Sequence, residues 1–450
     1  MFARSAGRRA VFLSLGWALT VSSAWAQDAQ EPHPELPGLE PTELPQFVAF
    51  TFDDNWIVER IEWANTLFSP LNNPAGNGIA NNYDGTPART TFFSNGVYLD
   101  QDGVPEAWRA SFDDGHEIAN HTDGHPNGRE SSFDQAAWAS EMTTCSSKMT
   151  DPVSGVGPTV IRGFRTPYLG YNAATYAALD QLGFEYDSTL GSCWPSSQDG
   201  SNCLFPYTLD DGSPDAQALN AGWGEPLVAS HPGLWEVPVS TLMVPPDSLA
   251  ATYSFTPGLR GRIPTDMPDP SHYEPATGKL AGLDYTAFVD AGMTGPEFLA
   301  TLKYTFDLRY DGNRAPMVIV GHTHVFSDAA RRQALADFLA YVLAKPATRV
   351  RPVHDIVEWM RHPTSLTGQA PRPVVDGTGG SSASGGTSGS GGSDGALGGA
   401  GGDSSEPDGG LADPGCGCAV GPTSRTNPIL LAGLSLGLVA LTRLRRRTAG

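Results

Sequence analysis

Four short segments of the sequence carry residue types that could together form a hydrolytic metal site. Two histidines four residues apart and one carboxylate would give a divalent cation three protein ligands and leave a position open for water, as catalytic zinc sites require. A second carboxylate beside the first could act as a general base. The segments are Thr51-Phe52-Asp53-Asp54, His121-Thr122-Asp123-Gly124-His125, Arg165-Thr166-Pro167-Tyr168 and Gly321-His322-Thr323-His324.

The residues before two of these segments are typical of β-strands. Residues 47–52 form an apolar run, and residues 117–120 alternate in polarity before a loop. Both patterns predict that the chemical groups follow the carboxyl end of a strand, which is the face where α/β barrels place their active sites. Each motif alone has an ordinary explanation, because Asp pairs cap turns and helices and His-x-x-x-His arises by chance. Their convergence favours a site.

Apolar runs and helical patterns alternate along the middle of the chain, as a β/α barrel requires. The predicted strands are 47–52, 90–93, 117–120, 161–164, 184–187, 234–239 and 317–320, and the predicted helices are 58–67, 132–148, 173–181, 295–308 and 328–344. Residues 69–87 and 191–232 are too long for ordinary connections, so we expect rim loops over a substrate groove. Four aromatic residues could stack on sugars there: Trp194, Tyr207, Trp223 and Trp235.

The order of the motifs resembles the polysaccharide deacetylase family, also called the NodB-homology or carbohydrate esterase family 4 domain. The closer likeness is to its chitin-deacetylase-like branch, and it covers residues 45 to 360. This resemblance implies an α/β fold, a distorted (β/α)7 barrel with long rim loops. Further shared segments are Thr91-Phe92-Phe93, Gly115-His116-Glu117-Ile118, Phe164 to Leu169, Pro206-Tyr207-Thr208-Leu209, Trp235-Glu236-Val237-Pro238 and Asn313-Arg314-Ala315-Pro316.

The resemblance also implies the metal ligands and the base. Asp54, His121 and His125 would hold a divalent metal, zinc in the first place, with Co²⁺ or Mn²⁺ as alternatives. Asp53 would take the proton from water, and Arg165 would orient this base through charge-assisted hydrogen bonds. The spacing by itself does not say which of the two adjacent Asp residues faces the ion.

The remaining catalytic roles follow from the same resemblance. The backbone N–H of Tyr168 would stabilise the oxyanion. His322 would protonate the leaving amine, and Asp187 would keep that imidazole charged and oriented. His324 is a rival for the acid, because the family motif has one histidine at this point.

The function implied is a metal-dependent hydrolase that removes N-acetyl groups from N-acetylglucosamine-containing polysaccharide. Two alternatives remain open: an esterase that removes O-acetyl groups from xylan or peptidoglycan, and a non-catalytic sugar-binding surface module. With 49 acidic against 28 basic residues the net charge is −21, which argues against nucleic acid and anionic lipid surfaces as partners, since both would be repelled. A neutral polysaccharide fits better. The oligomeric state is not predicted.

The chain divides into five predicted segments. Residues 1–26 are a signal peptide, with basic residues before an apolar stretch and a small-x-small cleavage site. Residues 27–44 are a Pro/Glu-rich linker, and residues 45–365 are the deacetylase-like catalytic domain. Residues 366–415 are a Gly/Ser-rich tether, and residues 416–450 hold a Cys motif, a short apolar segment and an Arg-rich end.

The last segment resembles the myxobacterial C-terminal sorting tail. The implied protein is exported and placed at the cell surface or outer membrane, or released, after membrane association through this segment. A permanent single-span anchor is the alternative, although the apolar run is short for a span. Among the cysteines, Cys193 and Cys203 have a spacing that a loop-closing disulfide could serve in an exported chain, and Cys145 is expected to be a buried thiol.

Overall fold

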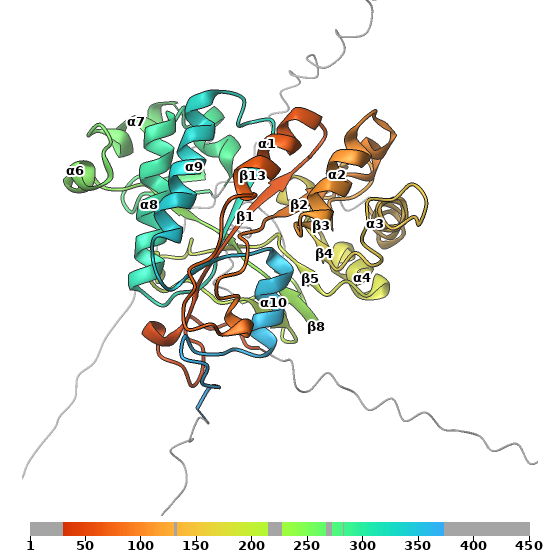
Figure 1. The fold of residues 1–450 in the computed structure, drawn as a ribbon, viewed down its shortest axis with the longest axis horizontal. Coiled ribbons are helices and arrows are strands. Elements are labelled where there is room, and N and C mark those ends of the chain that lie inside the picture. The colour runs from red at the N-terminus through yellow and green to blue at the C-terminus, as the bar shows by residue number, and fades with distance from the viewer. Residues whose placement is uncertain (1–29, 130–132, 215–226, 267–271, 282, 373–450) are drawn as a thin grey trace, which may run out of the picture. The chain divides into compact units, whose positions relative to one another are not determined.

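The strand Gln46–Asp53 (β1) lies at the centre of the fold, and all of its residues are buried. A parallel strand covered on both faces has a continuous apolar sequence, as this one does. The structure is a computed structural model that describes residues 30–129, 133–214, 227–266, 272–281 and 283–372 (Figure 1). The signal peptide, most of the tether and the sorting tail lie outside these residues and stay predictions.

β1 belongs to a nine-stranded sheet with the order β13-β1-β2-β3-β4-β5-β8-β7, in which β14 also pairs with β1. Every pairing is parallel except that of β7 with β8. The strands are β2 (Thr91–Ser94), β3 (Glu117–Asn120), β4 (Gly163–Phe164), β5 (Tyr186–Asp187), β7 (Tyr207–Leu209), β8 (His231–Glu236), β13 (Met317–His322) and β14 (Thr348–Val350).

The end of the sheet that holds β5 and β8 connects back to β13, the strand at its other end, through a second, smaller sheet. β5 and β8 lead into a second parallel pair, β6 (Gly191–Ser192) and β9 (Val239–Ser240). The backbone N–H of Val318 on β13 donates to Ser240 Oγ on β9 at 2.9 Å. The sheet therefore curls into a distorted barrel, and the predicted α/β barrel class is confirmed. A small antiparallel sheet joins β10 (Leu242–Met243), β12 (Lys279–Leu280) and β11 (Tyr273–Glu274).

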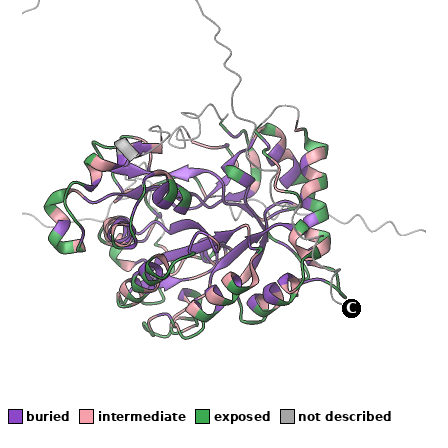
Figure 2. Cartoon of the chain, turned by 90° about the horizontal axis from the view of Figure 1, so that it is seen from above, coloured by how far each residue is buried: buried purple, intermediate pink, exposed green. Residues whose placement is uncertain are grey.

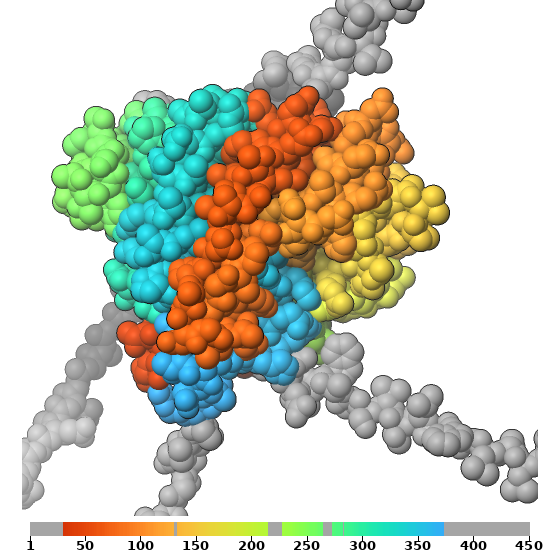
Figure 3. All heavy atoms as spheres, viewed as in Figure 1, coloured from red at the N-terminus to blue at the C-terminus, as the bar shows by residue number. Residues whose placement is uncertain are grey.

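Helices cover the outer face of the sheet and turn their buried sides toward it (Figure 2). On the face shown in Figure 3, α1 lies between α9 and α2. The five predicted helices end within three residues of the observed bounds. In the part of the chain that the structure describes, no helix is long and apolar enough to cross a membrane. The helices are α1 (Val58–Phe68), α2 (Val104–Asp113), α3 (Gln135–Met149), α4 (Ala173–Leu182), α6 (Ala250–Tyr253), α7 (Leu259–Asp266), α8 (Gly295–Asp311), α9 (Ala329–Leu343) and α10 (Val353–Arg361).

The prediction of a linker over 27–44 is wrong for its described part. Leu36, Leu39 and Leu44 are buried in a core cluster, and burial of each such side chain contributes about 1.5–3 kcal/mol. At the other end, the predicted start of the tether at 366 is too early, because Leu366 N–H donates to Glu43 O at 2.7 Å and Arg372 N–H to Gly38 O at 2.9 Å. The two flanks pair with each other and extend the folded domain beyond 45–365.

The loop 69–87 does not cover the site. Asn73 Oδ1 accepts the backbone N–H of Val350 on β14 at 2.7 Å, and β14 pairs with the amino end of β1. A helix-to-strand connection in a β/α fold returns to the amino end of the sheet, so this position follows from the topology. The sugar-stacking prediction is also wrong for Tyr207 and Trp235, which are buried. Trp194 is half-buried, and Trp223 lies outside the described residues.

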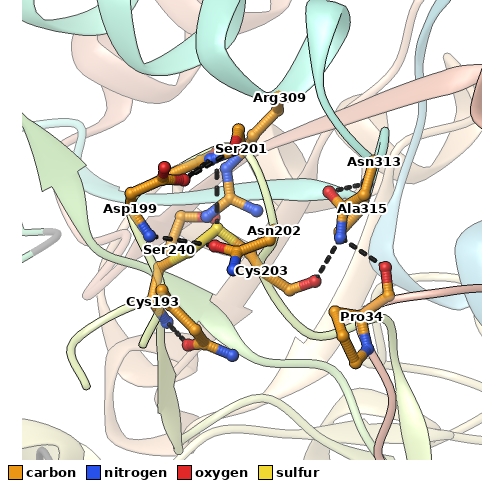
Figure 4. Close-up of a disulfide and its surroundings, with 12 residues drawn as sticks. Pro34, Cys193, Asp199, Ser201, Asn202, Cys203, Ser240, Arg309, Asn313 and Ala315 are labelled. Carbon is orange, nitrogen blue, oxygen red and sulfur yellow. Dashed lines mark hydrogen bonds between the residues drawn. A yellow bond between two sulfur atoms is a disulfide. The ribbon is translucent and has the colours of Figure 1, made fainter. Parts of the chain in front are cut away.

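A disulfide between Cys193 and Cys203 closes the loop after β6 (Figure 4). Asn313, just before β13, ties this loop to the amino-terminal segment, because its Nδ2 donates to Cys203 O at 2.6 Å and to Pro34 O at 2.7 Å. The disulfide that the spacing of these two cysteines allowed is therefore present. The remaining described cysteine, Cys145, is a buried thiol as expected.

Candidate metal and catalytic site

The predicted site residues come together because parallel strands end at the same edge of the sheet. Asp53, the last residue of β1, is in register with His322, the last residue of β13, and with Phe93 on β2. His121 follows β3 directly, and its backbone N–H donates to Ser94 O at 3.1 Å. Side chains from separate parts of the sequence therefore meet at the carboxyl edge.

The backbone at this edge is unusually strained. Five described non-glycine residues here have positive φ, a region that costs residues other than glycine about 1–3 kcal/mol. The chain turns out of the strand at Asp54 (φ 55°), which separates its carboxylate from that of Asp53. The others are Thr122, His125, Tyr168 and Leu169.

Asp54, His121 and His125 form a cluster whose ligand atoms all lie within 4.8 Å of one another. Asp54 Oδ1 is 3.1 Å from His125 Nε2 and 3.7 Å from His121 Nε2. The same oxygen is buried and accepts no hydrogen bond within the described part of the chain. A buried carboxylate oxygen that faces two imidazoles is an arrangement that a cation would satisfy.

His121 is oriented as a metal ligand. Its Nδ1 lies 2.8 Å from the backbone oxygen of Arg165, to which it donates, so that Nε2 carries the free lone pair. Metal-binding histidines generally fix their other ring nitrogen in this way. Burial lowers the pKa of His121 to about 3, so the ring is neutral, as a ligand must be. The donor set therefore fits a divalent metal.

Asp53 is held by Arg165, which is fully buried. Arg165 Nη1 donates to Asp53 Oδ1 at 2.8 Å and to Thr51 Oγ1 at 2.6 Å. The rest of the guanidinium binds Ser188, with Nε donating to its backbone oxygen at 2.8 Å and Nη2 to its Oγ at 3.0 Å. The guanidinium also lies 4.0 Å from the ring centre of Phe93. These contacts hold the side chain of Arg165 in a single conformation. Arg165 in turn fixes the Asp53 carboxylate beside the metal cluster.

Tyr168 lies in a short 3-10 turn, Pro167–Leu169, with φ of 59°. Its ring is 4.6 Å from that of His125 and more than half exposed. Thr166, the residue before the turn, is anchored by its backbone N–H, which donates to Thr189 Oγ1 at 3.0 Å. Thr166 thus anchors the turn to the protein interior beside the metal cluster, while the ring of Tyr168 is exposed to solvent.

His322 faces the cluster from β13, with its Nε2 3.9 Å from Asp54 Oδ2. Its Nδ1 lies 2.8 Å from Asp284 Oδ1, and its backbone N–H donates to Asp284 Oδ2 at 2.7 Å. Burial lowers the pKa of His322, but the charge and hydrogen bond of Asp284 outweigh burial and raise it to about 9. His322 is therefore a protonated imidazole at neutral pH.

The prediction that Asp187 is the partner of His322 is wrong. Asp187 lies on β5, and four strands separate β5 from β13 in the sheet order. Its oxygens accept hydrogen bonds from the hydroxyls of Thr189 at 2.7 Å and Tyr176 at 3.0 Å. Asp284 takes the predicted role because Leu283 forms an isolated parallel bridge with Val320. The sequence signal for it was a single acid among apolar residues in Ala281-Gly282-Leu283-Asp284-Tyr285.

His324, the rival acid, is differently placed. Its Nε2 lies 2.6 Å from the hydroxyl of Tyr285, and its ring centre is 5.5 Å from that of His322. Burial and the neighbouring His322 lower the pKa of His324. A neutral ring engaged with a tyrosine is less suited than His322 to donate a proton at the cluster.

Replacing Asp284 by Asn tests this dyad. We expect the alkaline limb of the pH–rate profile to move down by about 1–3 pH units, because a neutral amide no longer favours the charged imidazole and burial then dominates. His322 donates a proton only below its pKa, so activity is lost as pH rises through it. The profile of Glu297→Gln, a change in the capping box of α8, should match that of the parent. An unchanged limb in Asp284→Asn would contradict the dyad.

Comparison with known proteins agrees with this site. The polysaccharide deacetylase family model matches residues 41–186. This stretch therefore carries a polysaccharide deacetylase domain. Chitin deacetylase 1 from Bombyx mori is 25% identical over 341 residues, which cover 74% of this chain and 54% of that protein. Chitin deacetylase 8 from the same organism is 24% identical over 341 residues, which cover 73% of this chain and 74% of that protein.

The chain thus spans about half the length of the first of these relatives. Among solved structures, a provisionally named polysaccharide deacetylase from Mycobacterium smegmatis is 22% identical, with a TM-score of 0.43, and the match covers 74% of this chain and 95% of that one. A TM-score this low supports no conclusion by itself. The assignment of residues 41–186 to this domain rests on the sequence match, and the residues gathered at the carboxyl edge of the sheet agree with it.

Proposed function

We propose that this chain is a metal-dependent deacetylase that removes N-acetyl groups from N-acetylglucosamine-containing polysaccharide and releases acetate. One observation carries the proposal. A carboxylate held by Arg165 and an imidazole held by Asp284 flank the same Asp54, His121 and His125 cluster. Hydrolysis of an amide needs a base for the attacking water and an acid for the departing nitrogen, one on each side of the reacting carbon.

The three ligands suit zinc, since two imidazoles and one carboxylate make a catalytic zinc set with an open position. When bound, the metal would act as a Lewis acid toward the acetamide carbonyl and acidify the attacking water. Asp53 would accept the proton of that water, because Arg165 holds its carboxylate in place. The backbone N–H of Tyr168 would donate to the oxygen that gains charge as the carbonyl is attacked.

His322 favours an amide over an ester as the substrate. An amine is a poor leaving group until it is protonated, whereas an alkoxide needs less help. The raised pKa of about 9 keeps His322 protonated at the start of the reaction. Such a strongly held proton suits transfer to a basic amine nitrogen, and Asp284 would stabilise the imidazolium until transfer occurs.

The surroundings of the site support a sugar polymer as the substrate. Trp56, Tyr168 and Tyr285 are 39%, 58% and 39% exposed, and aromatic faces of this kind stack on sugar rings. Tyr285 and Tyr168 lie next to His322 and His125, with ring centres 4.8 and 4.6 Å away. The relatives are chitin deacetylases by name, so we propose a β-linked N-acetylglucosamine polymer.

Acetate release tests this function. The zinc-loaded protein should release acetate from chitin oligomers or peptidoglycan and leave a free amine for each acetate. Acetylated xylan serves as the matched ester substrate. Release from xylan alone would favour the O-acetyl esterase, and tight binding of polymer without release of acetate would favour a sugar-binding module.

A further inference from the structure

Two carboxyl groups that the proposed reaction does not use lie buried behind Arg165. Asp187 ends β5 and Glu236 ends β8, and the two residues are register partners on neighbouring parallel strands. Both are fully buried, and their side chains are hydrogen-bonded to each other. A pair of buried acids is costly unless it has a specific role, since apolar residues of similar size would stabilise the core better.

The pair is bonded to the backbone and hydroxyl groups around it. Glu236 Oε1 accepts the backbone N–H of Leu190 at 3.0 Å. Asp187 Oδ1 accepts the hydroxyl of Thr189 and Oδ2 that of Tyr176. Glu236 Oε2 has no other hydrogen-bond partner among the described residues. Burial raises the pKa of Glu236 well above its ordinary value and that of Asp187 to about 6, so one proton shared between the two acids fills this position.

The three residues after Asp187 connect the acid pair to the site. Ser188 provides a backbone oxygen and a hydroxyl to the guanidinium of Arg165, which in turn holds Asp53. The Thr189 hydroxyl donates to Asp187 and accepts twice from Thr166, from the backbone N–H at 3.0 Å and from the hydroxyl at 3.3 Å. Thr166 begins the turn that carries Tyr168.

We propose that Asp187 and Glu236 are positioning residues that fix residues 188–190 and, through them, both Arg165 and the Tyr168 turn. This inference rests on the proposed function. Its physical basis is that a short segment with no regular structure is bonded to a buried pair at Thr189 and at Leu190. Buried networks in which every member is satisfied are rigid, and an active site needs its groups held to a fraction of an ångström.

The variant Glu236→Leu tests the pair with an apolar residue of similar size. It leaves the Leu190 N–H without an acceptor and Asp187 without the shared proton. We expect kcat to fall by about 10- to 100-fold, as for other supporting contacts around a site, while KM and bound zinc stay at the parent's values. Glu236→Gln should recover most of the lost turnover, because its amide can donate to Asp187 and accept from Leu190 N–H.

The control is Glu117→Leu. Glu117 is also a carboxylate on a strand of the sheet, and it accepts hydrogen bonds from Thr91 and Tyr186 and from the backbone of His354. In the described part of the chain, the side chains of Thr91 and Tyr186 make no hydrogen bond to Arg165, Ser188 or Thr189. The control should lower the melting temperature about as much as Glu236→Leu and keep the parent's kcat for the folded fraction.

A crystal structure of Glu236→Leu separates this inference from the proposed function. We expect Arg165 to lose its hydrogen bond to Ser188 Oγ and to shift from Asp53, whatever substrate the enzyme acts on. If Glu236→Leu does not fold, Thr189→Val cuts the same connection at one hydroxyl and should also lower kcat. Parental kcat together with an unmoved Arg165 and Thr166 in the folded variant would overturn the inference and leave the deacetylase proposal intact.

Discussion

Replacing Asp53 by Asn should lower kcat by about 10²- to 10⁴-fold while the protein keeps its full metal content. The range is what general base catalysis contributes. Asn is the same size, and its amide oxygen can still accept from Arg165 Nη1, which donates to Asp53 at 2.8 Å. The substitution therefore removes the base without emptying the site. Single-turnover acetate release and metal analysis of the same preparation measure the two effects.

The neighbouring variant Asp54→Asn is the matched comparison. Asp54 Oδ1 is the oxygen that faces both His121 and His125, so its loss should reduce metal content as well as turnover. Because the two residues are adjacent and chemically identical, only their placement can make the outcomes differ. Reversed metal contents in the two variants would mean that the roles of the two acids are exchanged.

The sequence predicted most of this site because its groups lie at or just after the ends of strands that the apolar run 47–52 and the alternating pattern 117–120 identify. The apolar run from Phe47 to Phe52 identifies β1, which Asp53 ends, and His121 comes directly after β3. Predicting the metal cluster therefore requires only that β1 and β3 lie parallel in the same sheet, where both pair with β2. Asp284 could not be found this way, because it reaches His322 through the isolated bridge between Leu283 and Val320, and no regular strand marks that segment.

The predictions for the two flanking segments, a linker over 27–44 and a tether from 366, were wrong for a related reason. Leu36, Leu39 and Leu44 are spread among prolines and acids, so their composition is typical of a linker. Their burial depends on contacts with residues that are distant in the chain, such as the backbone bond from Phe205 N–H to His33 O at 3.1 Å. Local composition carries no information about such contacts, whereas the helices with strong caps were predicted closely. Thr294 and Glu297, for instance, form the capping box of α8.

Replacing His121 by Ala should abolish stoichiometric zinc binding and reduce activity by more than the roughly 100-fold typical of residues behind the ligands. His121 is almost fully buried and its Nδ1 is fixed on Arg165 O, so Nε2 is presented to the metal without loss of side-chain freedom on binding. The two remaining ligands, Asp54 and His125, make too few bonds to hold the ion. Dialysis against zinc followed by metal analysis measures the loss independently of any substrate.

His116→Ala is the control for this variant, because His116 is also a buried histidine just before β3. Its Nδ1 accepts the backbone N–H of Thr90 at 3.1 Å, and burial lowers its pKa to about 3. The control removes the same side chain from the core and should destabilise the fold, yet it should bind one zinc with the parent's affinity. Full zinc occupancy in folded His121→Ala would show that the cluster is not the metal site, since its other members leave too few ligands for tight binding.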